Sequence, residues 1–166
     1  MKPVTYTYNH WNCADFLRER GHIIVDTYVF SSESIAPVKI PFVIDSGAYI
    51  TVLTCPTARR IGLPLTGKYT VNLTSFNKER GSDKAELVVV PKIMIGKHSV
   101  EDVQVLVPLE DIDIAEVLGE NVLEYFNYTV DHGIDRVYFA KNPNPKPYRN
   151  PAKGIDLSCG RVLAQQ

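Results

Sequence analysis

The segment PFVIDSGAYITVLT, residues 41–54, places an acid, a hydroxyl and a glycine inside an apolar, β-forming run. Asp45, Ser46 and Gly47 are typical of a turn, because Asp and Ser bond back to the backbone and Gly accepts positive φ. A turn between two buried strands would also hold the Asp45 carboxylate at the floor of a cleft, where it could act as an acid or a base. The segment therefore has two interpretations, a plain turn and a catalytic one.

Residue types that bind metals are scattered along the chain. Cys13, Cys55 and Cys159 are too few and too far apart for a disulfide framework or a four-ligand zinc site, which favours a reducing, cytoplasmic setting. His10 and Cys13 have a spacing that a metal could use, but no second pair accompanies them. We therefore expect no metal and no other cofactor.

Short β-forming segments separated by turn residues make up most of the chain and must position the Asp45 turn. Pro56 as a start signal and Gly62 with Pro64 as stop signals predict a short helix over 55–64, and a second short amphipathic helix is expected at 122–126. The pattern predicts an all-β fold with one or two short helices. The expected strands are 22–30, 36–45, 50–54, 68–76, 85–96, 98–108, 127–131 and 135–140, with a polar hairpin tip at 77–84.

Length and composition are those of one soluble domain. The 166 residues are 45% hydrophobic and 22% charged, which suffices for a single substantial core. With 18 basic and 19 acidic residues the formal net charge is -1, so no global charge favours nucleic acid or a lipid surface. No segment approaches the ~18 apolar residues of a membrane span, and residues 1–20 lack the apolar core of a secretory signal. We expect neither nucleic acid nor a membrane as a partner.

The chain divides into three parts. Residues 22–140 carry the predicted elements, and residues 1–21 are treated as an N-terminal extension. Residues 141–166 are treated as a Pro-rich tail, because four prolines between 141 and 154 preclude a regular element. The tail is either a solvated linker, which we favour, or a basic arm for an acidic partner. Its basic residues are Lys141, Lys146, Arg149, Lys153 and Arg161.

The motif around Asp45 resembles the active-site motif of the retropepsin-like aspartic protease family. Two apolar residues precede Asp-Ser-Gly-Ala at 45–48, and Thr-Val-Leu follows at 51–53. The second signature of that family, two apolar residues and a glycine before a short helix, is similar to VLGENVLEYF at 117–126. The resemblance covers roughly residues 22–140. It implies a single-lobed closed β-barrel of the acid protease type with a homodimeric active site.

Asp45 alone supplies half of the chemistry that peptide hydrolysis needs. Water needs a base and the departing nitrogen needs an acid, and one carboxylate cannot be both at once. Two carboxyl groups about 3 Å apart cannot both ionise, so such a pair shares a proton and supplies both roles. Only one Asp-Ser/Thr-Gly occurs in this chain. The resemblance therefore implies that Asp45 of each subunit of a homodimer meets its counterpart across a twofold axis.

The resemblance also assigns roles to the neighbours of Asp45. Ser46 corresponds to the hydroxyl that bonds across the twofold axis and locks the two turns together. Gly47 lets the backbone approach the substrate, and Ala48 closes the turn. Gly119 is expected to pack beneath the Asp45 loop, where a Cβ would collide with it, although a plain break between strand and helix is an open alternative.

Two features depart from the family pattern. Retroviral members usually pair an acid after the alanine with an arginine after the second glycine, where this chain has Tyr49 and Glu120. A hydrogen bond from Tyr49 to Glu120 is one replacement, and a solvent-exposed Glu120 is the alternative. The hairpin in the flap position carries several charges and one glycine, so it is either a flap or a surface hairpin that closes over nothing. Its candidate flap residues are Ser75, Phe76 and Gly81.

The sequence leads to two hypotheses about function. In the first, the protein is a dimeric aspartic endopeptidase that hydrolyses an extended peptide or protein segment laid across the subunit boundary. In the second, the same fold is a non-catalytic dimeric module for peptide binding or dimerisation, which keeps Asp45 as a remnant. Asp45 weighs against the second, because two like charges at an interface are costly unless they are protonated or used.

Overall fold

The computed structural model of the chain describes residues 12–19, 22–32, 35–73, 83–145, 155–156 and 161–162. Some of the residues singled out above lie outside these ranges, and the predictions about them stay predictions. They are His10, Cys159, the flap candidates Ser75, Phe76 and Gly81, and the tail residues Lys146, Arg149 and Lys153.

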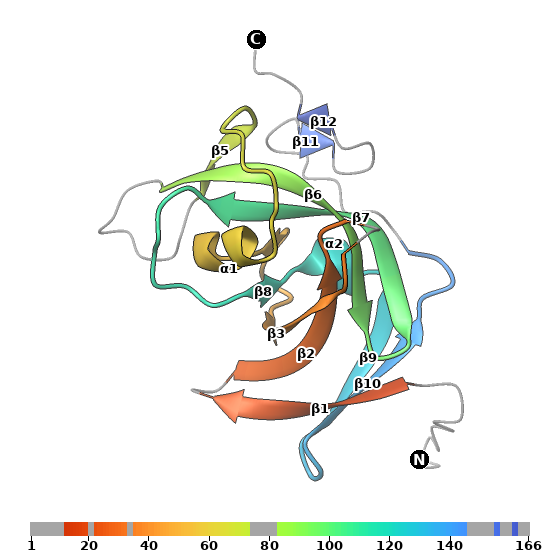
Figure 1. Cartoon of the computed structure of the whole chain (residues 1–166). Helices are drawn as coiled ribbons and strands as arrows, with labels where there is room; N and C mark the ends of the chain where they lie inside the picture. The colour runs from red at the N-terminus through yellow and green to blue at the C-terminus, as the bar shows by residue number, and fades with distance from the viewer. Residues whose placement is uncertain are drawn as a thin grey trace.

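Strands dominate the described residues, and only two short helices interrupt them (Figure 1). The mainly β fold that the sequence predicts is confirmed. The helices are α1 (Cys55–Arg60) and α2 (Glu120–Leu123). The strands are β1 (Asn12–Glu19), β2 (His22–Phe30), β3 (Val38–Ile44), β4 (Thr51–Val52), β5 (Thr70–Leu73), β6 (Asp83–Ile95), β7 (His98–Pro108), β8 (Val117–Leu118), β9 (Phe126–Asp131), β10 (Arg136–Lys141), β11 (Ile155–Asp156) and β12 (Arg161–Val162).

Six of these strands close into a barrel. Hydrogen bonds join them in the order β2, β3, β8, β4, β7 and β6, and β6 then pairs back onto β2. The β3–β8 and β4–β7 pairs are parallel, while the long β6–β7 and β2–β3 pairs are antiparallel. The interior is filled by fully buried aliphatic and aromatic side chains from several strands, including Val25, Ile40, Phe42, Val90 and Leu118. The closed barrel expected from the resemblance is confirmed.

A strand that the sequence analysis did not predict joins the barrel at one side. Residues 12–19, assigned above to an N-terminal extension, form β1 and pair with β2 on one edge and with β10 on the other. Figure 1 shows β1, β9 and β10 together on the side of the barrel away from β5. The segment NCADFLRE lacks the alternation that marks a half-buried strand, so its pairing is visible only in three dimensions.

Pro56 and Gly62 lie at the two ends of α1 as the sequence predicts, and Thr54 adds a cap that was not predicted. Thr54 caps the helix by accepting a hydrogen bond from the Thr57 amide at 3.3 Å, Pro56 lies in the first turn, and Gly62 beyond the end has a φ of +75°. The Glu116 carboxylate accepts hydrogen bonds from the Thr54 amide at 2.6 Å and from its hydroxyl at 2.8 Å. These bonds attach the start of α1 to the segment before β8. The second helix begins at Glu120, two residues before its predicted start, and ends before Phe126.

Neither α1 nor α2, the helices of the described ranges, is long and apolar enough to cross a membrane.

Candidate active site

Asp45 follows the last residue of β3 and opens a tight turn. The Asp45 amide donates to the carbonyl of Leu118 at 3.2 Å, and the Ala48 amide donates back to the Asp45 carbonyl at 3.1 Å. The Gly47 amide donates to Oδ1 of the Asp45 carboxylate at 2.8 Å. The turn therefore holds the partly buried carboxylate in one orientation, as the catalytic interpretation of this segment requires.

The chain after β8 lies against this turn. The amide of Glu120 donates to the carbonyl of Ala48 at 2.8 Å, and the amide of Asn121 donates to the carbonyl of Tyr49 at 3.2 Å. Both donors belong to the first turn of α2, whose amides have no partner within the helix. The Asp45 loop satisfies them, so the two sequence signatures form one unit.

Gly119 allows this close approach. A Cβ at this position would lie 2.6 Å from the carbonyl carbon of Ile50 and 2.8 Å from the amide nitrogen of Thr51. The φ of Gly119 is -93°, which any residue can adopt. Glycine is therefore required here by the lack of space for a Cβ and not by the backbone conformation. Gly119 also lies between β8 and α2. It therefore packs against the Asp45 loop and also separates strand from helix, the two roles that the sequence analysis considered for it.

A polar network that the sequence analysis missed ties the two loops together from within. Oδ1 of Asn121 accepts hydrogen bonds from the amide of Thr51 at 2.8 Å and from its hydroxyl at 3.0 Å, and Nδ2 donates to the carbonyl of Gln104 at 2.7 Å. The buried Thr51 hydroxyl in turn accepts from the Gly119 amide at 3.1 Å. An asparagine two residues after a glycine is common in protein sequences. The sequence alone therefore gave no sign that Asn121 joins the two loops.

Ser46 is exposed. Burial raises the pKa of Tyr128 on β9, the charge of Glu120 raises it further, and the Ser46 side chain lowers it without cancelling the rise. Burial also raises the pKa of Glu120. Glu120 is partly buried, so the alternative of a solvent-exposed Glu120 is wrong. Tyr49 is 55% exposed. Its hydrogen bond with Glu120 stays a hypothesis.

A separate apolar cluster flanks the Asp45 turn. Val52, Ala85 and Leu106 are its buried members, and they come from β4, β6 and β7. Around them lie side chains that are only partly buried, and two of these, Ile50 and Val117, belong to the segments that form the turn and its supporting loop. The partly buried members are Ile50, Val71, Leu87, Ile114 and Val117. The cluster therefore includes residues from both of the segments that hold the Asp45 turn.

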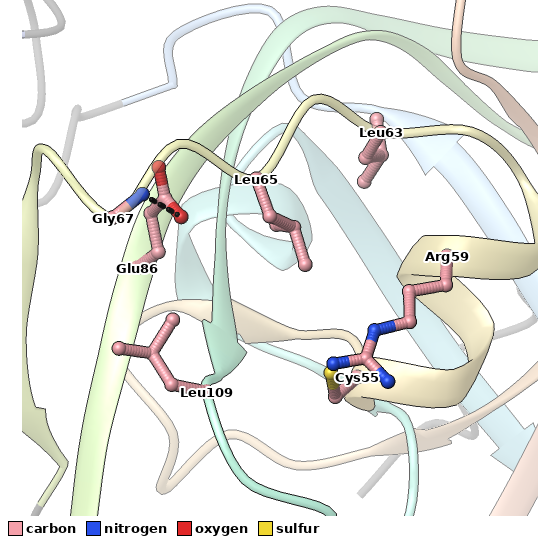
Figure 2. Close-up of a pocket in the computed structure, with 7 residues that line it drawn as sticks. All are labelled: Cys55, Arg59, Leu63, Leu65, Gly67, Glu86 and Leu109. Carbon is pink, nitrogen blue, oxygen red and sulfur yellow. Dashed lines mark hydrogen bonds between the residues drawn. The ribbon is translucent and has the colours of Figure 1, made fainter.

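A pocket of about 390 Å³ lies between α1, the following loop and β6 (Figure 2). Arg59 and three leucines contribute to its lining, and Glu86 lies at its edge. Side chains alternate along a strand, so Glu86 points to the face of β6 opposite to Ala85 and Leu87. The pocket is thus separated from the apolar cluster by the β6–β7 sheet.

Glu86 holds the loop before β5 onto β6. It is 2% exposed, and its carboxylate accepts hydrogen bonds from the Thr66 amide, the Thr66 hydroxyl and the Gly67 amide, each at 2.8 Å. Figure 2 shows the bond to Gly67. Burial alone would raise the pKa of Glu86, but the hydrogen bonds from Gly67 and Thr66 outweigh it and hold the pKa below its ordinary value.

We expect Glu86→Gln to destabilise the fold at neutral pH by roughly 1 to 3 kcal/mol, because the new amide would face a backbone donor. A lowered pKa means that the charged Glu86 stabilises the fold above the ordinary carboxyl pKa and that this contribution is lost as the pH falls through the folded-state value. Urea unfolding at pH 7 and at a series below pH 4.5 measures the difference. It should shrink toward low pH, and a constant difference would contradict this role. Glu101→Gln, at an exposed position, serves as the control.

No group of three or more His, Cys, Asp or Glu side chains that could hold a metal ion occurs within the ranges given above for the structure.

Comparison with known proteins places this site in a family. The family model described as "gag-polyprotein putative aspartyl protease" matches residues 33–125, more than half of the chain. The curated protein "Uncharacterized protein RP867" of Rickettsia prowazekii (strain Madrid E) is 31% identical over 113 residues, which are 65% of this chain and 47% of the relative. The chain thus spans about half the length of that relative.

The solved structure of a Rickettsia protein gives the same answer. The retropepsin-like aspartic protease from Rickettsia conorii matches 81% of this chain and 96% of its own, with a TM-score of 0.57 and 27% identity. The EIAV protease complexed with the inhibitor HBY-793 matches 73% of this chain and 92% of its own, with a TM-score of 0.45 and 19% identity. With its Asp-Ser-Gly turn resting on the Gly119 loop of a closed barrel, the chain belongs to the retropepsin-like aspartyl protease family.

Proposed function

We propose that the protein is an aspartic endopeptidase whose active site is completed by a second copy of the chain. The observation that carries the proposal is the way the Asp45 turn is held by the loop around Gly119 in a member of this family. A turn that served only to reverse the chain would not need a glycine packed against its backbone from a distant segment. Rigid support of this kind is what a catalytic carboxylate needs.

The chemistry divides between two Asp45 carboxyls. One takes a proton from the attacking water, and the other protonates the departing amide nitrogen. The pair can hold one shared proton because two neighbouring carboxylates do not both ionise. The bond from the Gly47 amide keeps each carboxylate in place while protons move. Ser46 is next to Asp45 and exposed in the single chain, so in the proposed dimer it would contact the partner's turn.

The substrate that we propose is an extended peptide with apolar side chains on either side of the cleaved bond. The apolar cluster beside the turn would accept such side chains, and its partly buried members are the ones that a substrate could still cover. An extended peptide can add to a sheet as a further strand, so its backbone would be bound without regard to sequence. The strands β5 and β6 pair in antiparallel fashion and flank residues 74–82, the segment for which we propose the flap role.

We expect the purified protein to cleave such peptides with a rate per subunit that falls on dilution, because dissociation removes half of each site. Mass spectrometry of the products and initial rates over a wide range of protein concentration measure this. A rate strictly proportional to protein concentration down to the lowest concentrations would contradict a shared site. Peptide binding without any cleavage would instead favour the non-catalytic module of the same fold.

A further inference from the structure

The segment that joins β7 to β8, residues 109–116, carries part of the apolar cluster beside the Asp45 turn. Ile114 lies within this segment and Val117 is the first residue of β8, and both are partly buried members of the cluster. Side chains that a substrate covers bind it best when they are already in place, because ordering them on binding costs affinity. The strand β8 has only two residues, so its own pairing gives this segment little support.

Glu116, the last residue of the segment, is bonded to two other parts of the barrel. Its carbonyl accepts a hydrogen bond from the Val43 amide of β3 at 2.8 Å. Its carboxylate accepts from the Thr54 amide at 2.6 Å through Oε2 and from the Thr54 hydroxyl at 2.8 Å through Oε1. Both side chains are half-buried. Glu116 thus joins the end of the segment to β3 and to the junction between β4 and α1.

Thr54 is a fixed anchor for this carboxylate. The amide of Leu53, the fully buried residue before it, donates to the carbonyl of Leu106 on β7 at 3.0 Å. The Thr54 hydroxyl accepts from the Thr57 amide of α1, which leaves its one hydrogen for Glu116. The position of Thr54 is therefore set by β7 and α1, and not by the segment that it holds.

The Asp45 turn is held by other bonds. They run from the Asp45 amide to the carbonyl of Leu118 and from the Glu120 amide to the carbonyl of Ala48, and neither uses the Glu116 side chain. The bond from the Glu116 carbonyl to β3 belongs to the backbone, so it survives a change of side chain. Loss of the Glu116 carboxylate should therefore act on the apolar surface and not on the catalytic turn.

We propose that Glu116 is a positioning residue for substrate binding, whose carboxylate holds Ile114 and Val117 where they receive an apolar side chain of the peptide. The inference rests on the proposed function in one respect, namely that this surface is the one that the substrate covers. The contact between Glu116 and Thr54 does not depend on it.

A double-mutant cycle tests the contact without reference to activity. Wild type, Glu116→Ala, Thr54→Val and the double variant are unfolded in urea at one fixed protein concentration. Valine keeps the shape of threonine and removes only the hydroxyl, and the lost bond to Thr57 cancels because it is lost in both backgrounds. Thr54→Val should raise the unfolding equilibrium constant about 10-fold in wild type and at least about threefold less in Glu116→Ala. Equal factors in both backgrounds would overturn the proposal.

Kinetics then test the positioning role. In the dimer-saturating range of protein concentration, Glu116→Ala should raise KM for an apolar peptide about 3- to 10-fold and leave kcat within about twofold, because substrate binding and not the turn is affected. Thr54→Val should do the same from the other side of the bond, and Thr54→Ser, which keeps the hydroxyl, should retain the KM of wild type.

Glu110→Ala is the matched control, because it removes a carboxylate from an exposed position in the same segment. It should change neither KM nor kcat. An unchanged KM in both Glu116→Ala and Thr54→Val would show that the contact has a structural role alone and overturn the proposal. A fall in kcat at constant KM would overturn it as well, since the effect would then lie on the turn.

The two proposals fail in different ways. If wild type cleaves no peptide, the proposed function is wrong and the role of Glu116 in substrate binding falls with it, while the unfolding cycle still decides whether Glu116 and Thr54 are coupled. If wild type is active and the variants keep its KM, the proposed function stands and only the role of Glu116 is overturned.

Discussion

Replacing Asp45 with asparagine should lower kcat/KM by at least about 10³-fold while the fold stays intact. The amide cannot take a proton from water or give one to a leaving group, so the chemistry is lost. The amide oxygen can still accept the hydrogen bond from the Gly47 amide, which the Asp45 carboxylate accepts at 2.8 Å, so the turn should persist. Peptide cleavage rates and the urea unfolding midpoint measure the two effects.

The chain offers a matched control at a second turn. Oδ1 of Asp131 accepts a hydrogen bond from the Gly133 amide at 2.8 Å, the same local geometry as at Asp45. Asp131→Asn should therefore leave both activity and stability nearly unchanged. Equal activity of wild type and Asp45→Asn would exclude Asp45 as the catalyst.

Mixing the inactive variant with wild type tests whether the site is shared. If subunits exchange and pair at random, a dimer with one Asp45→Asn chain has one carboxylate and no activity. The activity should then fall as the square of the wild-type fraction. A linear fall would mean that each chain works alone.

Gly119→Ala should be the most damaging single-methyl change near the site. The added Cβ would lie 2.6 Å from the carbonyl carbon of Ile50, a backbone atom that cannot rotate away. The loops would have to separate, at a cost of about 2 to 3 kcal/mol in the free energy of unfolding. Because a shift of about 1 Å in a catalytic group can cost 10²-fold in rate, kcat should fall more steeply than stability alone predicts.

Gly133→Ala provides the comparison for this steric prediction. There a Cβ would approach only the side-chain oxygen of Asp131, at 3.2 Å, on an exposed hairpin turn. Urea unfolding and cleavage rates of both variants measure the difference. Losses of stability that agree within about 0.5 kcal/mol would show that the loops do not need the close approach at Gly119.

The sequence by itself determined the fold class and the position of the turn. Runs rich in Val, Ile and Tyr, broken by turn residues, predict strands because β-branched and aromatic side chains fit a pleated surface. The position of α1 was equally readable, because Pro56 and Gly62 act on the backbone within a few residues. These signals are local, so they survive without knowledge of the rest of the chain.

Only the tertiary structure decided what each turn is for. Asp45 and Asp131 have the same bond to a glycine two residues later, and they differ in what lies behind them. The Asp45 turn rests on the loop around Gly119, which is brought there by the parallel pairing of β3 with β8. That pairing joins segments far apart in the chain, so no window of sequence contains it.

The supporting residues were hidden for the same reason. Asn121 is an ordinary polar residue in the sequence, and β1 has no clear periodicity. Each acquires its role from a partner that closure of the barrel brings near: Thr51 for Asn121, and β2 with β10 for β1. A hydrogen bond between distant segments depends on the position of both, and the sequence specifies those positions only through the complete fold.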